Sequence, residues 1–534
     1  MKKKVLSILL CMAMLSSLAV GCGGKENSTK EDNKKVETEK KEEIDTEASM
    51  VIPVEEDVVS LNMLQNCLTE TGLAMLGSLH DHLLTVNPDG SLNYYLAQNL
   101  EISEDGTVYT LTLNKDAKWH DGTPVTADDV IFTYDALKAG AINPQLSAAV
   151  TLDEKPIIYE KVDDVTVKFT LPRASNIYVT TLGMLYLVPK HVYENIPTDQ
   201  MDTCKENLEG WGNGPYKYKE YIPGEKLVVE RNDDYYRGKP SYKTIEYRIM
   251  PDSTAQEVAF LNGEIDYFRV KDAETLEKYE NNDKYSVHKF PEGRINYMQI
   301  NKHSTPLATV EAREALVKAL NIEEIVAGAY GSEELAKAAT GTVICAGEVN
   351  YNEDVENYKQ DLEQAKKLVK ETGLDKKPIK LVYNNNRAGM EEVALIIQQQ
   401  LKKAGIECKL EGIDSSAFFE LFFFNPTQDA WDIGLNGYQS SGRANYCSWY
   451  IDGSYFAQNC HTSEELNELW YKADVSTENT EEAYNEVSKM LQSYYTFVPI
   501  TNTNKVVVTP ANSKGWEDSA RKDLSDYMTL YKTK

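Results

Sequence analysis

Alternating apolar and polar residues predict β-strands in the first half of the chain. Successive side chains of a strand point to opposite faces, so a period of two is typical of a strand with one buried face. Turn-forming sequences such as Pro223-Gly224 separate the alternating segments. We therefore expect strands at residues 108–113, 165–171, 226–230 and 244–250.

The second half of the chain shows helical periodicity between shorter apolar runs. Residues 361–372 carry apolar side chains three and four positions apart and end before Gly373, a residue type favoured at helix C-termini. Residues 390–404 repeat this pattern, and the apolar runs 379–383 and 406–410 flank them as strands. A strand, a helix and a strand at this spacing predict a parallel sheet. The fold class is therefore α/β.

The first 21 residues have the features of an export signal. Three lysines follow Met1, and the apolar run at residues 5–20 is too short to span a bilayer. The run ends in LAVGC, which resembles a bacterial lipobox. We expect residues 1–21 to be a lipoprotein signal peptide and Cys22 to be the lipid anchor, on the outer face of the bacterial cell membrane. The alternative is an ordinary signal peptide that is cleaved nearby.

The residues after the signal differ in composition from the rest of the chain. Residues 22–50 are almost purely polar and show no apolar periodicity, so we expect them to form a flexible tether. The whole chain has 84 acidic and 56 basic residues, a formal charge of −28. This balance argues against nucleic-acid binding, which needs a dense basic face.

Motifs for catalysis are missing from the sequence. It contains no GxSxG elbow, no HExxH zinc motif and no Walker A loop. We therefore expect no catalytic residues and no enzyme activity. Without a phosphate-binding loop or membrane spans, we expect neither the ATPase nor the permease of a transporter.

Cysteine and histidine spacings point away from a metal site. Six of the eight cysteines lie beyond Cys22, and none has a CxxC or zinc-like spacing, so we expect neither metal nor cofactor. Cys447 and Cys460 are close enough in sequence to form a disulfide, and two buried thiols are the alternative. His80 and His82 would face the same side of a strand and suggest nickel, although we favour a structural role.

Residues 118–130 carry the most specific signal in the chain. They read KWHDGTPVTADDV, which closely resembles the signature of the family 5 solute-binding proteins, components of ABC importers for peptides, nickel and related solutes. The run also has a physical explanation as a strand, a tight turn at Asp121-Gly122, and a helix with Thr126 as its N-cap. We therefore interpret it as structural. Further matches to the family are GNGPY at 212–216, LNGEID at 261–266 and EAREAL at 311–316.

The resemblance implies a two-lobed, periplasmic-binding-protein-like fold of type II with an extra domain and a hinge between the lobes. Ligand would be enclosed between the lobes as they close. The implied boundaries are residues 51–91, 186–300 and 505–534 for domain I, 92–185 for domain II, and 301–504 for domain III, the second lobe.

The resemblance also places candidate ligand-binding residues on one strand and the loop after it. The family's peptide binders carry an Asp at this point that neutralises a peptide's ammonium group, but this chain has Ser441 there. Either another carboxylate replaces it, such as Glu70 or Asp452, or the ligand has no free amino terminus at this place. Arg443 would attract a carboxylate, or it is a surface residue. The candidates from this segment are Gly437, Tyr438, Gln439, Ser441 and Arg443.

Two further segments complete the candidate site. Residues 294–301 resemble the strand that crosses between the lobes, where Tyr297 and Gln299 would face the same side and contact the ligand. Core packing is the alternative for Tyr297. Glu70 and Thr71 lie in a segment that we expect to be a ligand-contacting loop, with a plain surface role as the alternative for Glu70.

The expected function is that of a cell-surface substrate-binding lipoprotein of an ABC importer. It would capture oligopeptides or dipeptides and deliver them to membrane permease subunits, and we expect a monomer. The alternative is a protein of the same fold that binds a non-peptide solute, such as a sugar or a nickel chelate, or that senses a peptide signal.

Overall fold

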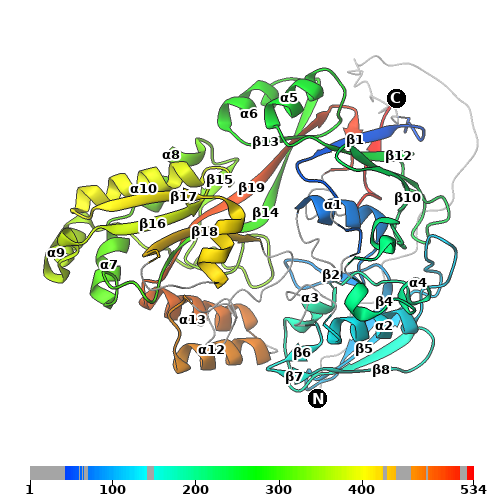
Figure 1. Cartoon of the computed structure of the whole chain (residues 1–534), viewed down its shortest axis with the longest axis horizontal. Helices are drawn as coiled ribbons and strands as arrows, with labels where there is room; N and C mark the ends of the chain where they lie inside the picture. Colours follow the sequence, from blue (N-terminus) through cyan, green and yellow to red (C-terminus); the bar gives the residue numbers. More distant parts are fainter. Residues whose placement is uncertain are drawn as a thin grey trace, which may run out of the picture. The chain divides into compact units, whose positions relative to one another are not determined.

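A computed structural model describes most of the chain from residue 43 onward, and Glu43–Lys534 form one compact unit. Figure 1 shows the arrangement of its helices and strands. The described residues are 43–58, 60–62, 64, 70–140, 149–183, 185–201, 203–385, 387–424, 430–439, 459–476, 479–516 and 526–534.

The first four-stranded sheet joins the start of the chain to its middle. β1 runs parallel to β12, and β11 and β10 continue the sheet in antiparallel pairs. Trp516, Tyr527 and Leu530 pack in the same apolar cluster as Met50 and Tyr247, so the C-terminal residues complete this core. The strands, in sheet order, are β1 (Ser49–Val54), β12 (Thr244–Ile249), β11 (Lys226–Arg231) and β10 (Tyr216–Ile222).

A second four-stranded sheet is antiparallel throughout. Helix α2 (Ala127–Lys138) packs on it through residues such as Val130 and Tyr134, which share a core with Leu111 and Phe169. The strands, in sheet order, are β4 (Ala97–Ile102), β5 (Val108–Leu113), β9 (Thr166–Thr170) and β8 (Ile158–Lys161).

The largest sheet has seven strands and mixes both directions. β16 is parallel to β17 and β18, whereas β14 pairs antiparallel with both β18 and β19. The two long strands β14 and β19 lie side by side over most of their length (Figure 1). The strands, in sheet order, are β13 (Phe268–Val270), β19 (Phe497–Pro510), β14 (Tyr285–Ile300), β18 (Ile433–Gln439), β16 (Ile379–Asn384) and β17 (Cys408–Ile413), and β15 (Ala336–Ala338) pairs with β19.

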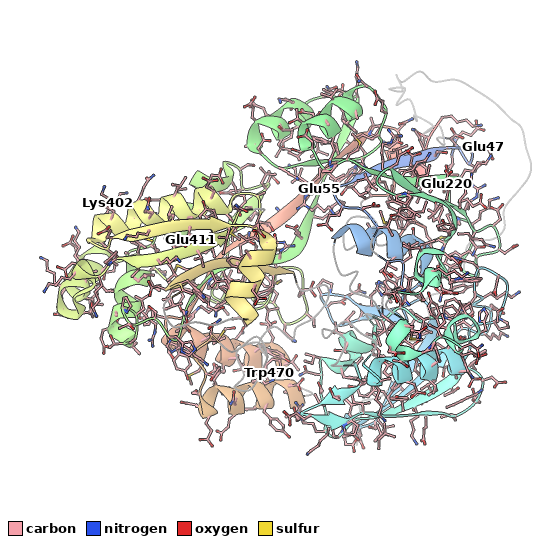
Figure 2. The ribbon with its side chains drawn as sticks, in the orientation of Figure 1. Glu47, Glu55, Glu220, Lys402, Glu411 and Trp470 are labelled. Atoms are coloured by element: carbon pink, nitrogen blue, oxygen red, sulfur yellow. The ribbon has the colours of Figure 1, made fainter. Side chains whose placement is uncertain are left out.

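Helices cover this sheet in the way that their apolar stripes require. Val393, Ile397 and Leu401 of α10 share a core with sheet residues, whereas Lys402 of α10 and Glu411 of β17 are exposed (Figure 2). The helices of this half are α7 (Val310–Lys318), α8 (Ile322–Tyr330), α9 (Leu362–Thr372), α10 (Met390–Ala404), α11 (Ser415–Phe419), α12 (Glu464–Val475) and α13 (Thr480–Ser493).

The remaining helices all precede β14 in the chain. The other helices are α1 (Glu70–Leu79), α3 (Tyr178–Gly183), α4 (Lys190–Tyr193), α5 (Ser253–Leu261) and α6 (Ala273–Glu280). Two-stranded pairs are β2 (Leu84–Val86) with β3 (Leu92–Tyr94), β6 (Thr151–Leu152) with β7 (Lys155–Pro156), and β20 (Ser513–Lys514) with β21 (Tyr531–Lys532). Single turns of 3-10 helix occur at Thr198–Gln200, Lys205–Leu208 and Leu374–Lys376, and a π-helix at Glu420–Phe424.

The local predictions from periodicity are confirmed with small changes. The expected strands match β5, β9, β11 and β12, and the strand–helix–strand unit matches β16, α10 and the parallel β17. Helix α9 begins after Asp361, whose carboxylate accepts a hydrogen bond from the Gln364 N–H (2.9 Å), and it ends at Gly373 with φ 74°. The domain boundaries that the resemblance implies stay a prediction.

Two expected local conformations are wrong. The segment around Glu70 and Thr71 is the first turn of helix α1 rather than a loop, because Met75, Leu76 and Leu79 of that helix are buried in the core. The expected strand before the Asp121-Gly122 turn is only a single bridge, between Lys118 and Pro124. The helix of that motif does have Thr126 as its N-cap, and the Thr126 N–H donates to Asp129 Oδ2 (2.8 Å).

Candidate functional site

The centre of the candidate site is the pairing of β14 with β18. Their antiparallel register places Tyr297 opposite Asn436 and Asn296 opposite Gly437. Opposite residues of an antiparallel pair project from the same face, and neighbours along a strand project from opposite faces. The predicted residues are therefore divided between the two faces of one sheet.

The first face holds Tyr297, Gln299 and Tyr438 in a packed core. Tyr297 and Gln299 face the same side, as expected, and are 1% and 4% exposed. The Tyr297 ring packs against Tyr438 and against Phe497, with centroids 5.5 and 4.6 Å away. The Tyr438 hydroxyl donates to the Val343 carbonyl oxygen, so this ring is anchored inside the protein.

Polar contacts on this face fix the same side chains. Gln299 Nε2 donates to Cys460 Sγ (3.1 Å), and Asn436 Nδ2 donates to the Tyr297 hydroxyl (3.2 Å). Burial raises the pKa of the Cys460 thiol to about 12, so this thiol stays protonated at neutral pH. In this conformation the three predicted side chains have structural partners, and their contact with a ligand stays a prediction.

The second face brings Gly437 together with residues that the sequence analysis did not single out. An added Cβ at Gly437 would lie 2.1 Å from Asn296 Oδ1 and 3.1 Å from Arg387 Nη1. Both polar groups therefore lie directly over the Gly437 backbone. Asn296 Nδ2 donates to the hydroxyl of Tyr330, the last residue of α8 (3.2 Å). We call Asn296, Tyr330, Arg387 and Gly437 the Arg387 cluster.

Arg387 lies just after the C-terminal end of β16 and before α10. The residue is half-buried, and burial of its guanidinium lowers its pKa to about 10, with the positive charge of Arg294 adding to the effect. Among the residues that the structure describes, no carboxylate lies within ion-pair distance of it. Asn296 Oδ1 is buried and likewise accepts no hydrogen bond from a described residue. The cluster therefore presents a partly desolvated cation beside an amide acceptor.

The nearby acidic residue is already engaged. Glu292, whose side chain is 6% exposed, contacts Arg269 of β13 at 2.8 Å and Arg294 at 3.5 Å, and it accepts a hydrogen bond from the Thr503 hydroxyl (2.5 Å). It lies where the pairing of β14 with β19 is irregular, between Pro291 and Arg294. Its close partners are therefore Arg269, Arg294 and Thr503, and its charge acts on Arg387 only from a longer distance.

Residues 91–465 match the family model of the bacterial extracellular solute-binding proteins, family 5 (middle region). The chain belongs to this family.

Individual relatives agree with this assignment. The oligopeptide-binding protein AppA of Bacillus subtilis is 26% identical over 482 residues, 84% of each chain. The dipeptide-binding protein of Escherichia coli K12 is 28% identical over 339 residues, which cover 59% of this chain and 62% of the relative. The crystal structure of the ABC transporter substrate-binding protein CtaP from Listeria monocytogenes superposes with a TM-score of 0.83 at 31% identity, covering 91% of this chain and all of CtaP.

Membership in family 5 establishes the fold and the general role of the protein. The family 5 protein has the two-lobed α/β fold of type II that the sequence predicts. It is a substrate-binding component of an ABC transport system and not an enzyme. The family is extracellular or periplasmic, and in the described part of this chain no helix combines the length and apolar character needed to cross a bilayer.

Several predicted residues lie outside what the structure describes. Ser441, Arg443 and Cys22 are among the residues not described, as are Asp452 and Cys447 from the alternatives. Gln439 is described as the last residue of β18 opposite Arg294, without its side chain. For Glu70 and Thr71, only the backbone at the start of α1 is described. Their roles stay predictions.

The two histidines considered for nickel have other surroundings in this family 5 protein. His82 Nε2 lies 2.9 Å from the Tyr186 hydroxyl, and its ring stacks on that tyrosine. The neighbouring His80 is buried, which lowers its pKa to about 3. Within the described ranges, no group of three or more His, Cys, Asp or Glu side chains has an arrangement that would hold a metal ion.

A sequence signal for Arg387 was present but was not used. Ligands of open α/β sheets bind at the carboxyl ends of parallel strands, and Arg387 directly follows such a strand. Because this strand was predicted correctly, the first basic residue after it, Arg387, could have been chosen as a candidate ligand-binding residue. Asn296 offered no such signal, because only the register with Gly437 reveals its position.

Proposed function

We propose that this protein is a cell-surface lipoprotein that captures peptides with a free carboxylate and delivers them to the permease of an ABC importer. Two relatives are named for oligopeptide and dipeptide binding, which supports a peptide ligand. The lipobox-like sequence ending at Cys22 supports attachment to the outer face of the membrane. The family's role in solute binding supports delivery to permease subunits.

The observation that carries the proposal is the state of Arg387. A cation removed from water costs free energy unless an opposite charge or strong hydrogen bonds compensate. No described carboxylate lies within ion-pair distance of Arg387; the charge of Glu292 acts on it only from farther away, while its neighbour Arg294 repels it. A ligand carboxylate would supply the missing charge and form charge-assisted hydrogen bonds with the guanidinium fork.

The surrounding groups suit the end of a peptide. The Asn296 Oδ1 acceptor is buried beside the guanidinium, so it can take an N–H from the last peptide unit. Gly437 leaves room for the Asn296 carboxamide and the Arg387 guanidinium, because a larger side chain would clash with both groups. The ligand would thus place its carboxylate on Arg387 and a backbone amide on Asn296.

Enclosure of the ligand would follow from movement at the long strands. β14 pairs with β19 on both sides of the irregularity at Pro291–Arg294, and its later half also pairs with β18. An irregular point in a long strand pair bends more easily than a regular ladder. We therefore place the hinge there, close to the Arg387 cluster, so that closure brings the first lobe over the bound carboxylate.

The test compares peptides with and without a free carboxylate. Protein purified without refolding is screened by thermal shift against di- to hexapeptides, and the best peptide is then measured by calorimetry beside its C-terminal amide. We expect the amide to bind about 10 to 100 times more weakly, as removal of a charged hydrogen-bond partner predicts. Arg387→Gln should weaken binding of the peptide acid by a similar factor and leave binding of the amide unchanged.

A matched arginine tests for nonspecific effects. Arg248 of β12 pairs with Glu246 at 2.7 Å, away from the cluster, so Arg248→Gln should bind both peptides like the unmodified protein. Equal binding of acid and amide would refute the role of Arg387. Binding of a sugar or a nickel chelate, with no response to any peptide, would refute the peptide function itself.

A further inference from the structure

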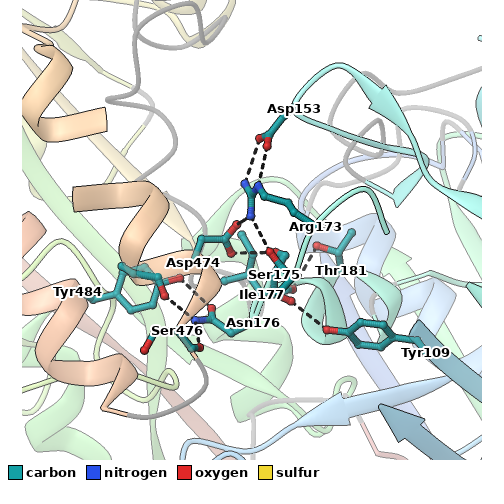
Figure 3. A network of polar contacts seen from close by, with 12 residues as sticks. Tyr109, Asp153, Arg173, Ser175, Asn176, Ile177, Thr181, Asp474, Ser476 and Tyr484 are labelled. Atoms are coloured by element: carbon teal, nitrogen blue, oxygen red, sulfur yellow. Dashed lines mark hydrogen bonds and ion pairs between the residues drawn. The ribbon is translucent and has the colours of Figure 1, made fainter. Parts of the chain in front are cut away.

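In the described part of the chain, a short segment that follows β9 joins domain II to the second lobe by polar contacts of Arg173, Ser175 and Asn176. Among the residues that the structure describes, every hydrogen bond and ion pair between 92–185 and 301–504 comes from Arg173–Asn176 (Figure 3). The other side is the end of helix α12, together with Tyr484 of α13. Neither side contains a predicted ligand residue or a member of the Arg387 cluster.

The charged part of this contact is an ion pair with a nearly inaccessible carboxylate. Arg173 Nη1 lies 2.5 Å from Asp474 Oδ2, and the Ser175 hydroxyl donates to Asp474 Oδ1 (2.8 Å). The Asp474 side chain is 1% exposed. Arg173 is itself held in place by Asp153 of its own domain, with Nε 2.6 Å from Asp153 Oδ2.

The uncharged part of this contact supplies hydrogen-bond donors to carbonyl groups at the end of helix α12. The Asn176 N–H donates to the Asp474 carbonyl oxygen (2.8 Å), and Asn176 Nδ2 donates to the carbonyl oxygens of Ala473 (2.6 Å) and Ser476 (3.0 Å). The Tyr484 hydroxyl donates to Asn176 Oδ1 (3.0 Å). Carbonyl groups at a helix C-terminus lack partners within the helix. Asn176 therefore acts as a cap that one domain supplies to a helix of the other lobe.

Apolar contacts surround these polar groups. Ile177 packs against the apolar cluster of the second lobe that contains Trp470 and Tyr484. The Arg173 guanidinium lies over the Tyr471 ring, 4.9 Å from its centroid. Water is thus excluded from one side of the ion pair, which strengthens the electrostatic interaction.

We propose that Arg173–Asn176 and the α12 end at Asp474 form a latch that stabilises the closed conformation and thereby sets ligand affinity from outside the ligand site. The inference rests on the opening and closing proposed above. Only the closed conformation makes these contacts, since separation of the lobes would return Asp474 and the helix-end carbonyls to water. The latch therefore biases one equilibrium, between open and closed lobes.

The effect on affinity follows from this bias. A ligand that binds the closed form has an apparent Kd equal to the intrinsic Kd divided by the closed fraction. Without Arg173, the Asp474 carboxylate would stay buried and unpaired in the closed conformation, which is costly. In the open conformation the same carboxylate is hydrated, so the loss of its partner costs little. Loss of Arg173 therefore destabilises the closed form selectively.

The experiment measures the closed form without any ligand. Hydrogen exchange of the Asn176 amide reports the latch directly, because this N–H donates across the contact. Small-angle scattering reports the separation of the lobes in the same samples. We expect Arg173→Gln to lower the protection factor of this amide at least about tenfold, equivalent to about 1.4 kcal/mol, and to increase the radius of gyration.

Two further variants keep the result interpretable. Asn176→Ala removes three side-chain hydrogen bonds without touching the ion pair and should also open the lobes, which covers the case in which Arg173→Gln fails to fold. Adding Asp474→Asn to Arg173→Gln removes the buried unpaired charge, so the double variant should recover part of the protection. Arg248→Gln is the control and should behave like the unmodified protein.

The outcomes separate the latch from the proposed function. Unchanged scattering and unchanged protection in Arg173→Gln and Asn176→Ala would overturn the latch, even if peptides bind. An unprotected Asn176 amide in the unmodified protein would overturn it as well. Opening of both variants would support the latch even in a protein that binds no peptide, because no ligand enters the measurement.

Discussion

The Asn296 carboxamide occupies the space that a side chain at Gly437 would need. The two residues lie opposite one another on β14 and β18, and Asn296 Oδ1 lies 2.1 Å from the position of an added Cβ. Glycine is required here by close packing of a polar group rather than by the conformation of the backbone. This pair explains how the Asn296 carboxamide can lie directly over the sheet in the candidate site.

Gly437→Ala should therefore impair the site. The methyl group would displace Asn296 and crowd Arg387, and we expect a loss of about 1–3 kcal/mol in unfolding free energy and weaker ligand binding. Chemical denaturation and calorimetry measure the two effects. Asn296→Ala added to Gly437→Ala creates room for the methyl group, so the pair should recover stability. No recovery would show that the clash lies elsewhere.

Blocking the amino group of a bound peptide should matter little. Ser441 stands where the family's peptide binders carry an Asp, and a hydroxyl supplies no charge to an ammonium group. We expect N-terminal acetylation to weaken binding by less than about tenfold, or about 1.4 kcal/mol. A loss of several hundredfold by calorimetry would show that another carboxylate, such as Glu70 or Asp452, holds the ammonium group.

Two adjacent aspartates of the 118–130 motif should differ in their importance. Asp129 is buried and accepts hydrogen bonds from the N–H groups of Thr126 (2.8 Å) and Lys190 (2.9 Å). Asp128 has a half-exposed side chain that pairs with Lys161. We expect Asp129→Ala to cost about 1–2 kcal/mol of stability and Asp128→Ala less than about 0.5 kcal/mol.

The same pair of variants tests whether the motif is structural. Neither Asp128→Ala nor Asp129→Ala should change the affinity for a peptide, measured below the melting temperature of each variant. A loss of affinity without a loss of stability in either variant would contradict the structural interpretation of the motif.

Acid should destabilise the protein through buried histidines. Burial lowers the pKa of His80 to about 3 and that of His120 to about 4, whereas the unfolded chain titrates near its ordinary value of 6.5. Between these folded-state pKa values and 6.5, the unfolded state thus binds more protons than the native state. The contribution of the two neutral histidines to stability is therefore fully present above about pH 6.5 and is lost as the pH falls. Burial raises the pKa of Asp81 to about 6. Between pH 4 and 6 the native state therefore gains a proton at Asp81, and this offsets the loss of stability caused by one of the two histidines.

His80→Phe isolates this effect. Phenylalanine keeps an aromatic ring against Tyr186, whose centroid lies 5.7 Å from that of His80, and removes the titration. Urea unfolding gives the unfolding free energy at each pH between 4 and 6. The slope of this free energy against pH should be lower in His80→Phe than in the unmodified protein by up to about 1.4 kcal/mol per pH unit. His191→Phe, at a partly exposed position beside Asp121, serves as the surface control. Equal slopes for His80→Phe and the unmodified protein would contradict the assignment.

Membrane attachment should depend on one thiol. If Cys22 is the lipidated residue, Cys22→Ser should release the protein from the cell surface into the medium, because the variant cannot carry the lipid at this position. Cys11→Ser, a change within the expected signal peptide, should leave the protein in the membrane fraction. Retention of Cys22→Ser in salt-washed membranes would show that the anchor is wrongly assigned.

Local sequence determined the elements and the family. The period of two at residues 108–113 and the helical period closed by Asp361 and Gly373 appear unchanged in β5 and α9, because such patterns depend on neighbours within a few residues. The KWHDGTPVTADDV motif was specific enough to indicate the family without any structural information. The α1 segment was mistaken for a loop because its helix is stabilised mainly by burial of Met75, Leu76 and Leu79.

Tertiary structure alone decided which polar residues meet. Asn296 and Gly437 come together only through the β14–β18 register, and Arg173 lies beside Asp474 although 301 residues separate them. No local pattern encodes such pairs, because a polar side chain looks the same in sequence whether its partner is water or a distant charge. Packing of the whole chain selects the partner, and desolvation at that place gives Arg387 and Asp474 the energetic weight that their sequence neighbours lack.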